Sequence, residues 1–334
     1  MSALILSLGS TSAFAKYANS FLSFEVKTAK TFTEQNINLK VYPASLTKIL
    51  TAHIILRDTQ ELTDTTEITK TAWGYKFKNS SRTFLEPGMR VDIDSLLKGL
   101  LIQSGNDAAT ALAEYHSGSV KEFVKEMNKT AKDIGMDNSN FANPHGRHDK
   151  NHYTTASDFK KLIEHTLALT PTILEYTTLR KFTFNEITQY NRNRTLREDG
   201  AVGLKTGFTP QSGYNLSACY SVNNAMFCTL NFGETTPNKR TQKSLDALNK
   251  FKQTYQVTTI PKGKGYYQIN GIRYQFTHEA ETNILHSNAD TVKTTPKLLN
   301  AYCTRDCDAL ISVSDGTQTT TINAKATANF IAIN

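Results

Sequence analysis

The stretch Tyr42-Pro-Ala-Ser-Leu-Thr-Lys48 carries the pattern from which the rest of the chain is best understood. Pro43 favours an extended residue before it, and the apolar positions after Ser45 recur with a helical period, which predicts a helix from Ser45. Residues three apart on a helix are neighbours, so the Ser45 hydroxyl and the Lys48 amine share a face. Such a serine can be activated if the lysine is partly neutral, and burial beside another cation is the physical route to that state.

The same spacing occurs at Ser95/Lys98 and at Ser157/Lys160. The second pair starts a predicted helix, but the acidic residue after its serine suits ordinary capping, and its lysine points to a solvated face. The first pair lies inside a helical turn. Only Ser45 is predicted at a rigid helix end where backbone N–H groups are free, which makes it the candidate nucleophile.

Two further motifs contain residue types that suit the same chemistry. Ser104-Gly105-Asn106 lies in a predicted loop between two helices, the first over 93–102. Ser-x-Asn recurs only at 221–223, where a turn explains it. Lys205-Thr206-Gly207 occurs once, on a predicted strand that ends at Phe208. Its glycine lets a substrate backbone lie against the strand edge, and its lysine supplies a fixed positive charge.

The order of the predicted elements indicates the fold. A strand from Phe21 turns at 28–30 into a second strand, and the middle of the chain is helical. Short β-rich runs follow, at 181–188, 202–208, 214–221 and 225–232. An amphipathic helix through 245–255 closes this part. The order β, α, β with a terminal helix predicts a mixed α/β fold, in which helices pack on an antiparallel sheet and a helical lobe is inserted.

The composition changes after Ile260-Pro-Lys-Gly-Lys-Gly265 to threonine- and asparagine-rich sequence with short alternating runs. This change predicts a boundary near residue 257. The larger domain is expected over 16–257, and a small β-rich module over 258–334.

Composition and charge exclude several classes of protein. The 334 residues are 39% hydrophobic, and no apolar run approaches the roughly 18 residues that span a bilayer. A net charge of +8 suggests nucleic acid, but basic and aromatic residues do not interleave as a stacking groove requires, so no such partner is expected. Residues 1–15, ending in Ala13-Phe-Ala15, are typical of a secretory signal without a basic start. An ordinary apolar strand is the alternative.

Four cysteines fit an oxidising compartment. Asn223-Asn224 suits the left-handed angles of a tight turn, and a turn there makes Cys219 and Cys228 directly opposed residues of a non-hydrogen-bonded pair. A disulfide is geometrically reachable, and two reduced cysteines side by side are nearly as good an interpretation. Cys303 and Cys307 are four residues apart and able to close a small loop.

In the order Ser-x-x-Lys, Ser-x-Asn, Lys-Thr-Gly, the three motifs resemble those of the low-molecular-mass penicillin-binding proteins, the D-alanyl-D-alanine carboxypeptidases of the serine peptidase S11 family. The resemblance covers about 20–255. It includes Phe84-Leu-Glu-Pro-Gly88, Asn143-Pro-His-Gly146, His152-Tyr-Thr-Thr155 and Asn191-Arg-Asn193. It implies a β-lactamase/transpeptidase-like fold with a five-stranded sheet, a peptidoglycan stem peptide ending in D-Ala-D-Ala as substrate, covalent inhibition by β-lactams, and no cofactor.

The resemblance also implies a role for the residues of the first two motifs. Ser45 attacks the carbonyl of the penultimate D-alanine, with Lys48 as general base. Ser104 relays the proton to the leaving D-alanine, and Asn106 orients the substrate amide and Lys48.

The third motif is expected to bind the other end of the substrate. Lys205, with Thr206, holds the terminal carboxylate and helps to keep Lys48 neutral. Backbone N–H groups of Ser45 and Phe208 form the oxyanion hole. By family position, Arg192 and Arg240 are further candidates for the carboxylate, with ordinary surface arginines as the alternative.

Other functions stay open at this point. A D,D-endopeptidase acting on cross-links would use the same motifs with a different cleft. A penicillin hydrolase needs fast deacylation, and 141–153 contains no glutamate of the kind that class A β-lactamases use. A catalytically inactive envelope-binding protein would be marked by a broken motif, and all three are intact.

His145, His148 and His152 have a spacing found in zinc sites. They lie in a turn-rich loop, and one loop seldom turns three imidazoles inward, so no metal is predicted. His53 is interpreted as a core histidine. The strand-like end over 326–334 predicts an exported enzyme of the periplasm or envelope without a membrane anchor.

Overall fold

The computed structural model describes residues 19–77, 79–260, 262–269, 272–278, 281–287, 292–299, 307–314 and 319–328. The predicted signal over 1–15, the chain's end after residue 328 and Cys303 lie outside them. The chain divides into two compact units. The first comprises Thr31–Cys219, Thr229–Leu245 and the described residues up to Ser23, and the second comprises Phe24–Lys30, Tyr220–Cys228 and the described residues from Asp246.

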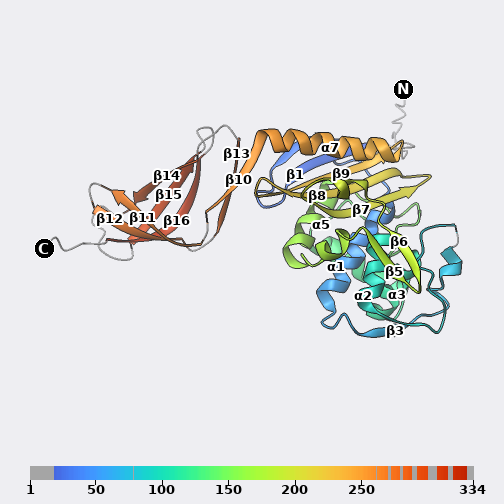
Figure 1. Cartoon of the computed structure of the whole chain (residues 1–334). Coiled ribbons are helices and arrows are strands. Elements are labelled where there is room, and N and C mark those ends of the chain that lie inside the picture. The colour runs from blue at the N-terminus through green and yellow to red at the C-terminus, as the bar shows by residue number, and fades with distance from the viewer. Residues whose placement is uncertain are drawn as a thin grey trace, which may run out of the picture. The chain divides into compact units, whose positions relative to one another are not determined.

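A five-stranded antiparallel sheet supports the helices around it, in the strand order β2-β1-β9-β8-β7 (Figure 1). Its strands are β1 Ser20–Glu25, β2 Thr31–Gln35, β7 Ala201–Thr209, β8 Gly213–Val222 and β9 Ala225–Glu234. Asn223 and Asn224 form the turn between β8 and β9 with φ values of 51° and 60°, as their residue types predicted. The mixed α/β fold with this sheet is confirmed.

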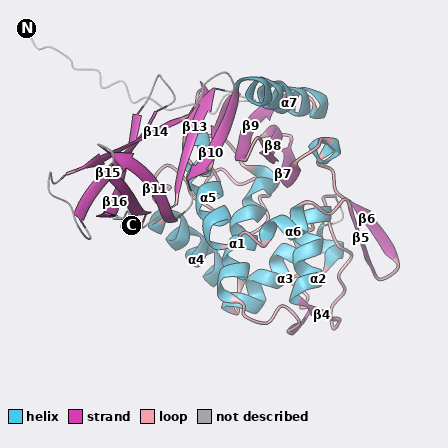
Figure 2. Cartoon of the chain, turned by 60° about the vertical axis from the view of Figure 1, so that its left-hand side comes forward, coloured by secondary structure: helices cyan, strands magenta, loops and turns pink. Residues whose placement is uncertain are grey.

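Both faces of the sheet are covered, because successive strand residues point to opposite sides. On one side, the ring of Phe232 in β9 lies 5.8 Å from that of Phe159 in α5, Ala156–Leu169. On the other, the side-chain amide of the preceding Asn231 donates to the carbonyl of Arg240 in α7, Pro237–Thr254. The sheet is therefore a buried layer between α7 and the helical lobe (Figures 1 and 2).

The inserted lobe is a group of short helices (Figure 2). They are the 3-10 turn Ala44–Thr47, α1 Lys48–Asp58, α2 Ile93–Lys98, the π-helical turn Gly99–Gln103, α3 Asn106–Ser117, α4 Val120–Asp133, α5 and α6 Ile173–Thr177. Further short elements are the 3-10 turns Gly74–Phe77 and Arg194–Arg197 and the paired strands β3 Thr65–Glu67 and β4 Arg90–Asp92. Ser119 and Thr155 cap α4 and α5 with their hydroxyl oxygens.

Four predicted elements differ in detail. The helix expected from Ser45 starts with a 3-10 turn, and the helix expected over 93–102 widens into a π-helical turn after Lys98. The run 181–188 is a hairpin of β5 Lys181–Phe184 and β6 Ile187–Tyr190, because Asn185 and Glu186 both adopt positive φ. The helix expected at 245–255 begins at Pro237, a residue suited to a first helical position.

The C-terminal part is built of β-strands, as predicted. Strands β10 Tyr255–Ile260 and β13 Thr282–Ser287 pair, and a five-stranded sheet has the order β11-β12-β16-β15-β14. Its strands are β11 Gly263–Ile269, β12 Ile272–His278, β14 Lys293–Leu298, β15 Cys307–Ser314 and β16 Thr319–Ala328. The predicted boundary at 257/258 falls within β10 and stays a prediction.

The three described cysteines, Cys219, Cys228 and Cys307, are disulfide-bonded, which decides against the reduced pair. No helix of the described ranges is long and apolar enough to cross a membrane.

Candidate active site

Ser45 lies in the 3-10 turn immediately before α1. The preceding Ala44 has a φ of 49°, an uncommon left-handed conformation for a residue with a side chain. Lys48, the first residue of α1, places its Nζ 3.1 Å from Ser45 Oγ. The predicted pair is thus formed, and Ser45 lines a cleft of about 1300 Å³.

Two glycines from distant segments press against this turn. A β-carbon at Gly146 would lie 1.8 Å from the carbonyl oxygen of Ala44. At Gly207, on β7, it would lie 3.0 Å from the carbonyl oxygen of Pro43 and 3.2 Å from the nitrogen of Ser45. Glycine permits this close approach, because it has no β-carbon. The sequence explained Gly207 by room for a substrate, and the structure adds the packing of β7 against the 3-10 turn that contains Ser45.

Lys48 is buried, and its amine is surrounded by hydrogen-bond acceptors. Besides Ser45 Oγ, its Nζ contacts Asn106 Oδ1 at 2.7 Å and the backbone carbonyl oxygen of His145 at 2.6 Å. Burial and then the charge of Lys205 hold the pKa of Lys48 well below its ordinary value, and the nearby Asp107 carboxylate opposes them. A lysine in this setting is suited to exchange a proton with Ser45.

The Ser104-Gly105-Asn106 loop follows the π-helical turn Gly99–Gln103. Ser104 has a φ of 69° and lines the cleft, as does Asn106 at the start of α3. While Asn106 Oδ1 accepts from Lys48, its Nδ2 donates to Ser80 Oγ at 2.9 Å. Because both ends of the amide have partners, its orientation is fixed.

Lys205, on β7, is buried beside the site. Burial, reinforced by the charges of Arg192 and Arg240, lowers the pKa of Lys205 to about 7. Its Nζ donates to the carbonyl oxygen of Thr206 at 3.2 Å. Lys205 therefore combines a positive charge near the cleft with an environment that makes this charge costly until an anion arrives.

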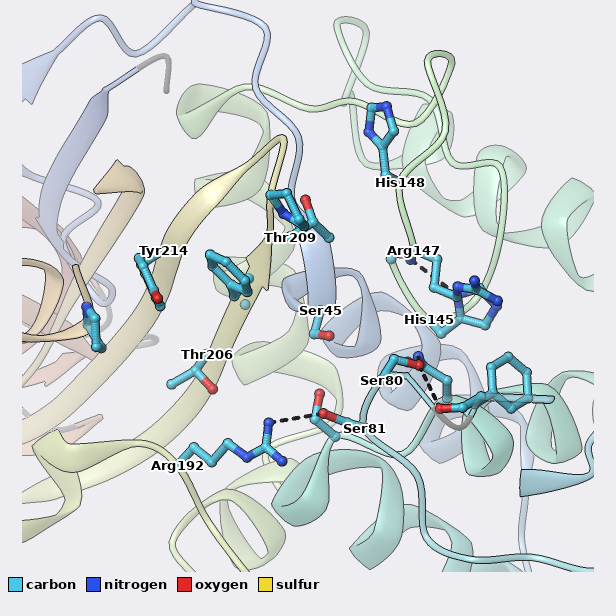
Figure 3. Close-up of a pocket in the computed structure, with 18 of the residues that line it drawn as sticks. Ser45, Ser80, Ser81, His145, Arg147, His148, Arg192, Thr206, Thr209 and Tyr214 are labelled. Carbon is cyan, nitrogen blue, oxygen red and sulfur yellow. Dashed lines mark hydrogen bonds between the residues drawn. The ribbon is translucent and has the colours of Figure 1, made fainter. Parts of the chain in front are cut away.

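The other predicted substrate-binding residues all line the cleft: Arg192, Thr206, Gly207, Phe208 and Arg240. Arg192 donates through Nη1 to Ser81 Oγ at 3.1 Å (Figure 3). Arg240 is buried and donates through Nη1 to the carbonyls of Gly207 and Asn215, at 3.1 and 3.0 Å. Part of the Arg240 guanidinium thus ties β7 to β8, and burial lowers its pKa to about 10.

Two features of the site were missed by sequence reasoning. The carbonyl of His145 is a backbone group and leaves no residue signature. Asp107 was not among the residues predicted for the site, but its buried carboxylate accepts from the backbone N–H groups of Thr83 and Leu85, at 2.8 and 3.2 Å, besides that of Ala108. Asp107 therefore holds the 80–85 loop against the start of α3. The signal available in the sequence was the position of Asp107 directly after the Ser104-Gly105-Asn106 motif.

The competing serine–lysine pairs have ordinary surroundings. Lys98 forms an ion pair with Asp94, and Lys160 forms one with Glu164, each one helical turn away. His53 is buried in α1 and its Nδ1 is hydrogen-bonded to a threonine hydroxyl.

The three histidines of the 143–155 region face different partners. His145 contacts the ring of Phe77, His152 is hydrogen-bonded to Thr47 through Nε2, and His148 contacts another aromatic ring. Among the described residues, no group of three His, Cys, Asp or Glu side chains is arranged to hold a metal ion.

Comparison with known proteins gives consistent matches. A family model described as D-alanyl-D-alanine carboxypeptidase, Peptidase_S11, matches residues 9–236. The D-alanyl-D-alanine carboxypeptidase DacA of Haemophilus influenzae is 37% identical over 215 residues, which are 63% of this chain and 55%, about half, of that protein. DacF of Bacillus subtilis, with the same description, is 35% identical over 275 residues, or 76% of this chain and 70% of the relative.

A solved structure, penicillin binding protein 5 from Haemophilus influenzae, superposes with a TM-score of 0.79 at 27% identity. The superposition covers 93% of this chain and 96% of that one.

Proposed function

The chain belongs to the peptidase S11 family of D-alanyl-D-alanine carboxypeptidases, and on that premise we propose that it removes the terminal D-alanine of peptidoglycan stem peptides through an acyl-enzyme on Ser45. The surroundings of Lys48 are the observation that carries this proposal. A neutral amine has two N–H bonds and one lone pair. The oxygens of Asn106 and His145 accept hydrogen bonds from the two N–H groups, so the lone pair is left to take the proton of the Ser45 hydroxyl.

In acylation, Ser45 Oγ bonds to the carbonyl carbon of the penultimate D-alanine, and its proton passes to Lys48 Nζ. The carbonyl oxygen takes the negative charge, and the backbone N–H groups of Ser45 and Phe208 stabilise it, each by about 3 kcal/mol. The packing of Gly207 against the Ser45 nitrogen supports this pairing of donors. The C–N bond then breaks, and Ser104 relays the proton from Lys48 to the departing amine.

Deacylation uses water in place of the serine hydroxyl. Water attacks the ester carbonyl, its proton goes to Lys48, and Ser45 recovers a proton as the shortened peptide leaves. During acylation Lys205 and Thr206 bind the terminal carboxylate, which then leaves with the released D-alanine, while Arg192 is a second cation and Arg240 holds β7. The charge of the carboxylate compensates the cost of keeping Lys205 buried.

The same substrate class supports an assignment of the enzyme outside the cytoplasm, in the periplasm or envelope. The disulfide-bonded cysteines support this assignment, because disulfides persist in oxidising compartments.

The test is the intact mass of the protein after incubation with benzylpenicillin. Wild type is expected to keep a covalent adduct, Ser45→Ala to form none, and Ser157→Ala, which removes the serine of a competing pair, to form it normally. Pure folded wild type without an adduct would overturn the proposal. Release of D-alanine from a pentapeptide, measured beside cleavage of cross-linked dimers, separates carboxypeptidase from endopeptidase, and an adduct that is quickly lost would indicate a penicillin hydrolase.

A further inference from the structure

The cleft has more positive charge than one carboxylate requires. The cations among its lining residues are Lys76, Arg147, Arg192, Arg194, Arg197 and Arg240. The lining contains neither Asp nor Glu, and none of these six forms an ion pair with a carboxylate in the described ranges. Like charges gathered without counter-ions on a concave surface attract anionic ligands.

Two of these cations, Arg147 and Arg192, lie on different sides of Ser45. Thr206 and Arg192 are on one side of Ser45, and His145 and Arg147 are on the other (Figure 3). The substrate has a direction, because its terminal carboxylate is bound at the Lys205 side and its scissile carbonyl lies at Ser45. The acyl part of the peptide therefore runs away from Thr206 and towards the far side of the cleft.

Hydrogen bonds within its loop hold the backbone of Arg147 in place. Its N–H donates to His145 Nδ1 at 3.2 Å, and its carbonyl accepts from Asn143 Nδ2 at 3.0 Å. The guanidinium lies 5.9 Å from the centre of the Phe77 ring, and Lys76, the residue before Phe77, also lines the cleft. The far side thus presents Arg147 and, on the segment that contains Phe77, Lys76.

We propose that Arg147, with Lys76, binds a second carboxylate of the substrate, on the residue that precedes the D-Ala-D-Ala terminus. This inference rests on the proposed function and specifies its substrate class. Stem peptides whose third residue has a free side-chain carboxylate are preferred over peptides whose third residue has a carboxamide or no acidic group.

The test uses three pentapeptides that differ only at the third residue: diaminopimelate with a free side-chain carboxylate, the same residue as its carboxamide, and lysine. Wild type is expected to release D-alanine from the first with a kcat/KM about tenfold above the others, a ratio that falls at high salt. In Arg147→Gln the ratio falls to within about twofold. Lys150→Gln makes the same charge change in the same loop at an exposed residue outside the cleft lining, and keeps the wild-type ratio.

Each result decides the inference. Equal use of the three peptides by wild type overturns it, and leaves the proposed function standing if D-alanine is released and benzylpenicillin forms an adduct. A preference that persists in both Arg147→Gln and Lys76→Gln overturns the assignment to these residues. If Arg147→Gln fails to fold by thermal unfolding, Lys76→Gln decides. No D-alanine release from any peptide and no adduct in wild type overturn the proposed function and this inference together.

Discussion

The candidate active site and the C-terminal sheet bury different kinds of residue. Lys48, Lys205 and Asp107 are all buried around the site. In β11, β12 and β14–β16, every described residue that is buried is apolar or aromatic. Alternation of apolar and polar residues along the strands is enough to build such a sheet, because it buries an apolar face without burying charge. Burying an unpaired charge costs several kcal/mol, so buried charges are kept mainly where chemistry requires them. The buried lysines therefore distinguish the candidate active site from the C-terminal sheet.

Replacing Ser45 is expected to have the largest effect on activity. Ser45→Ala removes the hydroxyl that is proposed to form the acyl-enzyme, so D-alanine release and acylation by benzylpenicillin are expected to fall by about 10⁴-fold or more. Steady-state release and intact mass measure the two losses. The thermal unfolding midpoint should stay near that of wild type, and an active Ser45→Ala protein would refute the role of Ser45.

Gly146→Ala is expected to have the next largest effect on the site. Gly146 has a φ of 81°, and its added β-carbon would lie 1.8 Å from the Ala44 carbonyl oxygen, so the turn Ala44–Thr47 has to move. Acylation by benzylpenicillin should slow by about 100-fold, since a misplacement of about 1 Å has that effect.

Gly118→Ala is the matched control for backbone strain. Gly118 also has a positive φ, 73°, but nothing lies within 4 Å of a β-carbon there. It should cost about 1 kcal/mol of stability and leave the acylation rate unchanged. If the two variants slow acylation equally, the close contact with Ala44 has no part in the effect.

The pH dependence of kcat/KM tests whether the buried Lys205 binds the substrate carboxylate. The pKa of Lys205 is lowered to about 7, so its charge is complete only well below pH 7 and is lost as the pH rises through that value. The kcat/KM for a short D-Ala-D-Ala peptide should therefore fall several-fold between about pH 7 and 9. A flat profile over that range would contradict the use of Lys205 for the carboxylate.

The same pKa has a consequence for folding. The unfolded lysine keeps its proton up to its ordinary value of 10.5, whereas the folded one releases it near 7. The unfolded state binds more protons in this window, so Lys205 makes the folded state more stable as the pH rises from about 7 towards 10.5.

Ile311→Ala in β15 should have the smallest effect on catalysis. Ile311 is fully buried opposite Ile322 in the C-terminal sheet, and its truncation is expected to lower the free energy of unfolding by about 2–5 kcal/mol. The kcat/KM for D-Ala-D-Ala peptides should equal that of wild type at a temperature where both are folded. A large drop would show that the sheet contributes to the chemistry.

The sequence predicted most of the fold, because its signals are local. Asn223-Asn224 predicted the turn of the long hairpin, and the helical period after Ser45 predicted the helix α1. The hairpin at 181–190 was missed, since Asn185-Glu186 is a less distinctive turn than two asparagines. The π-helical turn after α2 has no residue signature, and only packing decides it.

The sequence predicted which side chains belong to the candidate site, but not the backbone groups that contribute to it. Ser45, Lys48 and Asn106 were found by spacing, and the structure places them within hydrogen-bond reach of one another through Lys48 Nζ. The His145 carbonyl was invisible, because every residue has one. The second purpose of Gly207 was equally hidden, since it depends on a contact across the fold.

The contacts at Ala44 join three segments far apart in the chain: the turn itself, the loop that contains Gly146, and β7 with Gly207. None of them forms the site alone, so reactivity arises only when all three have docked. Penicillin labelling would then count completely assembled molecules, even in a preparation where spectroscopy already reports full secondary structure. A variant's labelled fraction would measure its yield of native protein, separately from the rate at which each native molecule reacts.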